Sequence, residues 1–305
     1  MTLQHYKLNF IDMKTPSYAT NLCSKNVQKL NFLYDTSPPF GAKEHFFHFL
    51  HGYVIPALHW CHEVQCRHVS FEDCGPLMNP KLAEACQLAS LDCSPLMHVA
   101  TQEQDSSTQC IIPRWDVQLI RFDGANQTPS EISMFRSKTA YILQFMLDRA
   151  QEVCKKQGTL EQWQQIDILV LRRSPDHPYY APGGKVKFPK YGRGRRALLN
   201  TLDIANHLAK SGYSVKEVDM GKLPLWEQII AFHNASSVIG ARGAEFAHLF
   251  WMRPGATAVM FATPTAKENN ASRSLSEIFN LRFISPKVES NFFSVEPEEI
   301  RAYLP

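Results

Sequence analysis

Arginine, glycine and glutamate residues meet in one short stretch of the chain, residues 237–257, which reads SVIGARGAEFAHLFWMRPGAT. An apolar run ends in a glycine-rich turn, and an apolar segment with helical spacing follows it. Helix N–H groups at such a turn bind anions, and a guanidinium adds bidentate hydrogen bonds. The stretch therefore predicts an anion site, for which a diphosphate is a suitable ligand. Its candidate residues are Gly240, Arg242, Gly243, Ala244 and Glu245.

Two further basic clusters precede this turn. Arg172 and Arg173 follow the apolar run IDILVL, and the loop GGKVKFPKYGRGRRALLN carries Arg195 and Arg196. Any one cluster is equally well explained as a solvated loop, but three clusters at strand ends of one sheet favour an anion site. The sequence has neither a Walker motif nor Gly-x-Gly-x-x-Gly, which gives little support to phosphoryl transfer from ATP or to dinucleotide binding.

The elements that would position these clusters are clearest in the second half. Apolar or alternating runs predict strands at 166–171, 213–220, 235–240, 256–262 and 281–285. Helical patterns lie between or after them, at 197–213, 223–235, 243–252, 272–280 and 295–304. Alternation at this spacing predicts βαβ units and a parallel sheet, so the fold class is α/β.

The first half is less regular. Helices are expected at 41–64, with a kink at Pro56, at 81–90 and at 133–156. We place a domain boundary near residue 158, which gives domains 1–157 and 158–290 and a C-terminal helix in 291–305 that packs back on the first domain.

Composition limits the classes of protein. The chain has 305 residues, 44% of them hydrophobic, and a net charge of +3, which suits two globular domains and does not favour nucleic-acid binding. No apolar stretch approaches the roughly 20 residues of a membrane span, and the first residues do not resemble a secretory signal. A cytoplasmic location is expected, with peripheral membrane association through the basic loops left open.

The eight cysteines all lie in the first 154 residues. A zinc site is one interpretation, but buried free thiols explain these residues better, because no Cys-x2-Cys pair is present. The set considered for zinc is Cys61, His62, Cys66, His68 and Cys74.

The second half resembles glycosyltransferase family 61, which contains plant xylosyl- and arabinosyltransferases and animal O-GlcNAc-type transferases. The residues that carry the resemblance are RSPDHPYY, YGRGRRALLN and LWEQIIAFHNASSVIGARGAEFAHLFWMRPGATAVMF. They match the family's arginines after a strand, its Arg-rich lead into an Asn-bearing helix, its glycine turn and its Pro-Gly before a strand. The likeness covers residues 166–265. In the first half, HFFHFLHGYVIPAL is similar to a family stretch and places His48 on the family histidine.

Four positions depart from the family pattern. The turn histidine of the family is Arg242 here, the glycine after the alanine is Glu245, the glutamate of the last strand falls on Met260, and Gly52 is at or next to a usual acidic position. These changes fit either a divergent subfamily or a loss of activity. We favour divergence, since a guanidinium in place of an imidazole still suits a diphosphate.

The resemblance implies a GT-B architecture, in which two Rossmann-like domains face each other across a cleft. The C-terminal domain would bind the nucleotide and the N-terminal domain the acceptor. It also implies an inverting reaction without the Asp-x-Asp metal motif, which this sequence lacks. We therefore expect transfer of xylose or N-acetylglucosamine from a UDP-sugar co-substrate to a glycan or glycoconjugate hydroxyl, with no bound metal or cofactor.

The candidate general bases are His48, Glu44 and Asp176. His48 and His248 both lie in apolar helical patterns, so burial in the core is the simpler role for each. Glu245 would reach a ribose hydroxyl or offset a helix dipole. The candidate donor-binding residues are Arg172, Arg173, Arg195, Arg196, Asn200, Gly240, Arg242, Gly243, Ala244, Glu245 and His248.

Two alternatives to a transferase stay open at this point. The first is a non-catalytic nucleotide- or carbohydrate-binding descendant of the same fold, which the changes at Arg242 and Met260 support. The second is an unrelated doubly wound enzyme such as a sugar-nucleotide epimerase. The missing Gly-x-Gly-x-x-Gly and the arginine clusters weigh against it.

Overall fold

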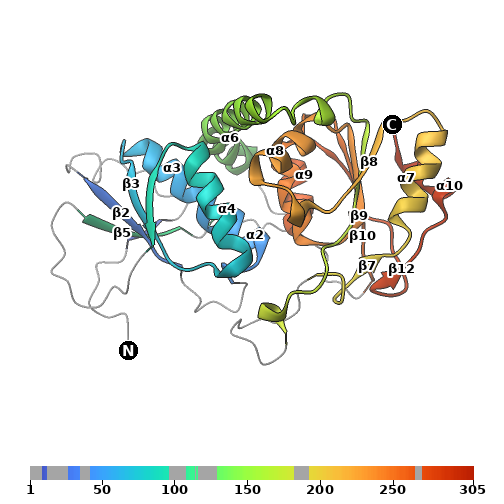
Figure 1. The fold of residues 1–305 in the computed structure, drawn as a ribbon, viewed down its shortest axis with the longest axis horizontal. Coiled ribbons are helices and arrows are strands. Elements are labelled where there is room, and N and C mark those ends of the chain that lie inside the picture. Colours follow the sequence, from blue (N-terminus) through green and yellow to red (C-terminus); the bar gives the residue numbers. More distant parts are fainter. Residues whose placement is uncertain are drawn as a thin grey trace. The chain divides into compact units, whose positions relative to one another are not determined.

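The computed structural model describes residues 9–11, 27–34, 42–95, 108–113, 115, 129–181, 192–264 and 270–305. The chain divides into two compact units, Met1–Gln118 and Leu119–Pro305, and each unit contains a five-stranded parallel sheet (Figure 1). The mixed α/β class predicted from the sequence is confirmed. The lysines at 185, 187 and 190 in the basic loop lie outside the described residues.

The first unit is built on a sheet with the strand order β1-β5-β2-β3-β4, and all neighbouring pairs are parallel. Its strands are β1 (Asn9–Ile11), β2 (Lys29–Phe32), β3 (His68–Phe71), β4 (Asp92–Pro95) and β5 (Thr108–Pro113). Its helical segments are α2 (Phe46–Phe49), the π-helix η1 (Leu50–Val54), α3 (Ile55–Glu63) and α4 (Gly75–Leu88). The helix expected at 41–64 is therefore broken into three parts.

The break lies just before Pro56, which is at the first turn of α3. Proline lacks an N–H group and disturbs the turn that precedes it, and here the backbone widens to the π-helix η1 at that place. The disturbance predicted from Pro56 is therefore found, as a π-turn on its N-terminal side.

The second unit is built on a sheet with the order β11-β10-β9-β6-β8, which is parallel throughout. Its strands are β6 (Ile168–Leu171), β8 (Val215–Val218), β9 (Ser237–Ala241), β10 (Thr257–Phe261) and β11 (Arg282–Ile284). The short strands β7 (Ala197–Leu198) and β12 (Phe292–Phe293) form a separate parallel pair.

Helices cover both faces of this second sheet (Figure 1). The helical segments are α6 (Pro129–Gln157), η2 (Glu161–Trp163), η3 (Pro178–Tyr180), α7 (Thr201–Lys210), η4 (Met220–Lys222), α8 (Leu225–Asn234), η5 (Ala244–Trp251), α9 (Asn270–Ile278), α10 (Pro297–Ile300) and η6 (Arg301–Tyr303). The segment expected as a helix at 243–252 is a 3-10 helix, η5. On one face, a core of aliphatic side chains from β6, α7, β9 and β10 is fully buried.

The boundary between the units differs from the one expected at residue 158. The long helix α6 belongs to the second unit, because it packs against α8 and α9. The boundary was expected at the end of this helix, whereas the helix itself packs against helices of the second unit.

The C-terminal helix also packs elsewhere than expected. Ile300 and Leu304 are buried in the core of the second unit together with Ile204 and Leu208 of α7. The C-terminal segment therefore completes its own unit instead of returning to the first one, because its two apolar residues pack with the buried residues of α7.

Two further observations concern the described residues only. None of their helices is both long and apolar enough to span a membrane. No group of three or more of their His, Cys, Asp and Glu side chains is arranged to hold a metal ion. Cys61, Cys66 and Cys74 are buried free thiols, as predicted, and burial raises their pKa values.

Candidate functional site

The strand order of the second sheet defines where a ligand would bind. From β6 the chain continues to β8 on one side, and then crosses to β9 on the other side. In open parallel sheets, ligands bind beyond the carboxyl ends of the strands at such a switch point. Arg173 follows β6 and Arg242 follows β9, so both arginines lie at this edge.

Four arginines gather at this edge, and we refer to Arg173, Arg195, Arg196 and Arg242 as the arginine cluster. The main-chain carbonyl of Arg242 accepts a hydrogen bond from Arg173 Nη1 at 3.0 Å and from Arg196 Nη1 at 3.3 Å. This single carbonyl therefore joins the end of β6 to the loop before β7. The backbone N–H of Arg242 donates to Phe261 at 2.8 Å, which fixes the turn against β10.

The arginine cluster is electrostatically unbalanced. Burial, and then the charges of Arg195, Arg242 and Arg173, lower the pKa of Arg196 to about 9, with Glu245 acting in the opposite direction. Burial and the neighbouring guanidinium groups also lower the pKa values of Arg195 and Arg242. A pKa of about 9 still leaves Arg196 charged at neutral pH, so its repulsion by the neighbouring guanidinium groups must be offset by fold stability or by an anion.

Glu245 is the carboxylate that partly offsets this charge. Its Oε2 lies 3.6 Å from Arg173 Nη1, and the two side chains are only 17% and 10% exposed. The sequence analysis considered a ribose contact or a helix dipole for Glu245, and the structure adds an ion pair with Arg173.

Gly243 lets Arg173 and Glu245 come this close to the turn. A Cβ atom added at Gly243 would lie 2.4 Å from Arg173 Nη1 and 2.0 Å from Glu245 Oε2. Its φ of −166° is extended backbone that any residue adopts, so close packing is the reason for glycine here. Gly240 is similarly close to Leu171, with an added Cβ 3.0 Å from the Leu171 Cβ.

Several polar atoms of the cluster are not satisfied by the protein. The Nε atoms of Arg173 and Arg196 are buried and have no hydrogen-bond partner in the described part of the chain. Buried N–H groups without partners are rare in folded proteins and call for a ligand or water. Beside Arg196 and Arg242 lies a small open pocket, lined in part by Phe261, Asn291 and Phe293.

The other predicted donor residues lie in different surroundings. Arg172 points to Glu217 of β8, 3.5 Å from its Nε, and its side chain is 47% exposed. His248 is completely buried in η5, where its Nε2 donates to Gln228 Oε1 at 2.7 Å. His248 is thus a core residue with no surface for a donor contact, because Phe232 and Gln228 enclose it.

Asn200 forms two hydrogen bonds to the backbone of one residue. Its Nδ2 donates to the carbonyl of Val295 at 2.8 Å, and its Oδ1 accepts from the Val295 N–H at 3.2 Å. Both polar ends of the side chain are therefore used to hold the C-terminal segment, where a donor contact was expected from the sequence.

Asp176 lies beside the loop that carries the arginines. Its Oδ1 accepts from the N–H of Gly194 at 2.7 Å. The sequence analysis considered this carboxylate as a general base, and it is already engaged with the backbone.

Glu44 and His48 belong to the first unit, before and within α2, and both are partly buried. The ring of His48 contacts Phe47, with centroids 5.4 Å apart. Ala244 begins η5 beside Gly243, as predicted. The structure thus gathers Arg173, Arg195, Arg196, Arg242, Gly243 and Glu245 in one unit.

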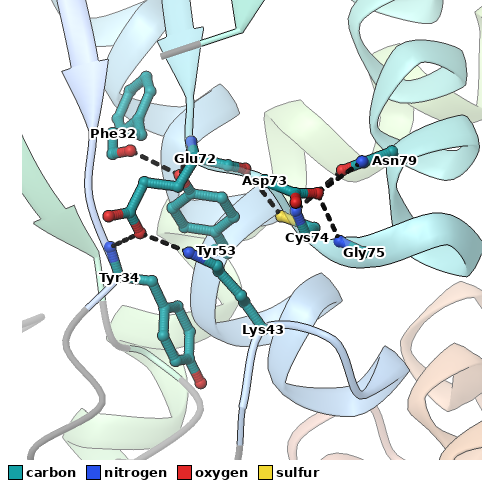
Figure 2. A network of polar contacts seen from close by, with 9 residues as sticks. All are labelled: Phe32, Tyr34, Lys43, Tyr53, Glu72, Asp73, Cys74, Gly75 and Asn79. Atoms are coloured by element: carbon teal, nitrogen blue, oxygen red, sulfur yellow. Dashed lines mark hydrogen bonds and ion pairs between the residues drawn. The ribbon is translucent and has the colours of Figure 1, made fainter. Parts of the chain in front are cut away.

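A second polar cluster, missed in the sequence analysis, lies at the carboxyl ends of β2 and β3 (Figure 2). Glu72 Oε2 accepts from the N–H of Tyr34 at 2.9 Å and from Lys43 Nζ at 2.8 Å. The hydroxyl of Tyr53 donates to the Phe32 carbonyl at 2.5 Å and accepts from the N–H of Glu72 at 2.9 Å. The signal in the sequence is the carboxylate directly after the short run HVSF, which was not recognised as a strand.

The comparison with known families identifies the class of the protein. The profile of the family described as Glycosyltransferase 61 matches residues 46–260, which begins at α2 and ends in β10. Because this match covers most of the chain, the protein belongs to glycosyltransferase family 61. A search of curated proteins found no match. Membership of the family makes the protein a glycosyltransferase by class, with a sugar donor and an acceptor as substrates.

Proposed function

We propose that this protein transfers a sugar from a UDP-sugar to a hydroxyl group of a glycan or glycoconjugate, with inversion at the anomeric carbon and without a metal ion. The arginine cluster at the switch point of the second sheet is the observation that carries this proposal. Xylose and N-acetylglucosamine are the sugars that the family suggests.

The chemistry of the leaving group explains the need for the cluster. When the acceptor hydroxyl attacks the anomeric carbon, the bond to the diphosphate breaks and negative charge grows on the departing phosphate. Positive groups held in place before the reaction stabilise that charge best. Arg173 and Arg196 are held by the Arg242 carbonyl, so two guanidinium groups are fixed relative to each other.

The charge of the arginine cluster also bears on whether the reaction needs a metal ion. In many transferases a divalent cation neutralises the diphosphate, whereas here four guanidinium groups face a single carboxylate, Glu245, among the described residues of the cluster. The surplus positive charge matches a diphosphate and supports metal independence. In this proposal the arginines, in place of a divalent cation, neutralise the charge of the diphosphate.

The acceptor proton requires a base from elsewhere. A general base must come within hydrogen-bond reach of the acceptor hydroxyl. His48 and Glu44 are our candidates, since both are partly exposed and lie in the unit that the family resemblance assigns to the acceptor.

Thermal stabilisation by nucleotides is the direct test. Binding to the folded state raises the melting temperature, because it stabilises the fold by an amount that grows with the logarithm of the ratio of ligand concentration to Kd. We expect UDP or one UDP-sugar to stabilise the protein equally with Mg²⁺ and with EDTA. Arg242→Ala should weaken binding about tenfold or more, as expected for a lost charge-assisted hydrogen bond.

Arg172→Ala is the matched control, because Arg172 is adjacent to Arg173 but pairs with Glu217 outside the cluster. Equal losses in both variants would mean that overall charge, and not the cluster, binds the nucleotide. No stabilisation by any nucleotide would contradict the proposal.

A second candidate function is a nucleotide- or carbohydrate-binding protein without turnover. It is favoured by Met260, which occupies the family's glutamate position and is only 1% exposed in β10. Product release separates the two functions. Liberation of UDP from the donor that stabilises the protein, with acceptor present, supports the transferase, while binding of that donor without UDP release across an acceptor panel supports the second candidate.

A further inference from the structure

The arginine cluster raises the question of what holds its two loop members in place. Arg195 and Arg196 precede the two-residue strand β7, and their neighbours in the cluster repel them. We propose that Asp176 is a positioning residue, whose carboxylate fastens the turn that carries Arg195 and Arg196 and takes no part in proton transfer. This inference rests on the proposed function, because it assigns a role within the donor site.

Hydrogen bonds at and beside Asp176 hold the turn in place. Its Oδ1 accepts the Gly194 N–H at 2.7 Å, two residues before Arg196. A backbone hydrogen bond lies next to it, in which the Arg193 N–H donates to the carbonyl of Ser174 at 2.9 Å. The segment after β6 and the turn before β7 are thus joined by two adjacent hydrogen bonds.

Two glycines make room for this carboxylate. A Cβ added at Gly194 would lie 2.0 Å from Asp176 Oδ2, and one added at Gly192 would lie 2.7 Å from Oδ1. Gly192 also has a φ of +79°, a left-handed conformation that side chains disfavour. The turn therefore packs closely against the carboxylate, which stays exposed to solvent, and this close fit suits an anchor of the turn.

The other side of the arginine pair is fastened independently. Asn200 holds Val295 through two hydrogen bonds, and the N–H groups of Ala197 and Leu199 donate to Asn291 and Phe293, each at 2.8 Å. With that side fixed, Arg195 and Arg196 can still move through changes in the turn at Gly194. The hydrogen bond from the Gly194 N–H to Asp176 limits this movement, and so keeps the two guanidinium groups near Arg173 and Arg242 despite their repulsion.

The test compares three variants of the full chain. Asp176→Ala removes the anchor, and Asp176→Asn keeps an oxygen that accepts the Gly194 N–H but cannot act as a base. Asp167→Ala is the matched control, since Asp167 accepts a backbone N–H, that of Ser214, at 2.8 Å near the opposite end of β6. The measurements are hydrogen exchange in residues 192–199 without ligand, the affinity for UDP and for pyrophosphate, and the kcat and donor KM.

The anchor role predicts a specific pattern. Asp176→Ala should speed exchange at Gly194 and weaken UDP and pyrophosphate binding about tenfold, which corresponds to one hydrogen bond to a charged group. Asp176→Asn should resemble the wild type in exchange, donor KM and kcat. Asp167→Ala should leave residues 192–199 and both affinities unchanged.

Three results would overturn the inference. A loss of kcat of more than about 100-fold in Asp176→Asn with unchanged UDP affinity would identify a base. Similar behaviour of Asp176→Ala and Asp167→Ala would indicate a general effect on stability. Unchanged exchange in Asp176→Ala would show that the turn needs no anchor. If the wild type binds neither UDP nor pyrophosphate, the proposed function fails, and the exchange experiment still decides the role of Asp176.

Discussion

The two units each carry a charged cluster at the carboxyl ends of parallel strands, and the two clusters are built in opposite ways. In the first unit Glu72 is paired with Lys43, and the hydroxyl of Tyr53 is used as donor and as acceptor (Figure 2). In the second unit four arginines share one glutamate, and two buried Nε atoms lack partners in the described residues. A cluster whose charges are paired stabilises the fold. A cluster with unpaired charge lowers the stability of the fold, and a ligand of opposite charge can offset that loss.

The strongest test of this contrast replaces two members of the arginine cluster. Arg173→Gln with Arg196→Gln should lower UDP affinity by more than about 100-fold, since each removes a charge-assisted contact worth roughly 1.5–3 kcal/mol. Titration calorimetry gives the affinity.

The same double variant tests the free protein. The pKa of Arg196 is lowered in the folded state, so its protonated form opposes folding at neutral pH, and removing it relieves that cost. We expect the melting temperature without ligand to be unchanged or to rise by about 2–4 °C. A clear fall would mean that the guanidinium groups are structural.

In the cluster around Glu72, loss of a polar group should lower stability and leave UDP affinity unchanged, the opposite of the effect expected for the arginine cluster. Tyr53→Phe removes a buried hydroxyl and leaves the Glu72 N–H and the Phe32 carbonyl without their partner, which should cost about 2 kcal/mol of unfolding free energy. UDP affinity should not change. Urea denaturation measures the free energy of unfolding, and calorimetry measures the UDP affinity. A loss of UDP affinity with unchanged stability would show that Tyr53 takes part in ligand binding.

The smallest effect is expected at the ion pair of the first unit. Glu72→Gln weakens the contact with Lys43, and because Glu72 is 30% exposed the loss should stay below about 1 kcal/mol and shrink in high salt. Urea denaturation at low and high salt measures it. A much larger loss, independent of salt, would indicate that the bond to the Tyr34 N–H, and not the ion pair, stabilises the cluster.

The second unit was largely predictable from the sequence. Its strands are mostly apolar or alternating runs, such as IDILVL, and helical patterns lie between or after them, so periodicity identifies them. In the first unit β2 has four residues and β4 reads DCSP, so neither gives a pattern that length and polarity can distinguish from a loop.

The candidate site was predictable in composition but not in connectivity. The arginines at strand ends are visible in the sequence, and five of them were selected. Arg172 contacts Glu217, whereas Arg173 belongs to the cluster. This difference depends on the alternation of side chains along the strand and on the position of β8 as a neighbour. The bonds from Asp176 to Gly194 and from Asn200 to Val295 join residues 18 and 95 positions apart, beyond any local pattern.

The pairing of β7 with β12 has a consequence for the order of events during synthesis. The arginine loop is fastened by residues 291–295, which leave the ribosome about 95 residues after Asn200. A nascent chain can pair β6, β8, β9 and β10 before that segment exists, because local contacts close sooner than distant ones, whereas Ile300 and Leu304 complete the core afterwards. We therefore expect the loop that carries Arg195 and Arg196 to be fastened only after the sheet has paired, so an unfinished chain has a paired sheet and an unfastened arginine loop.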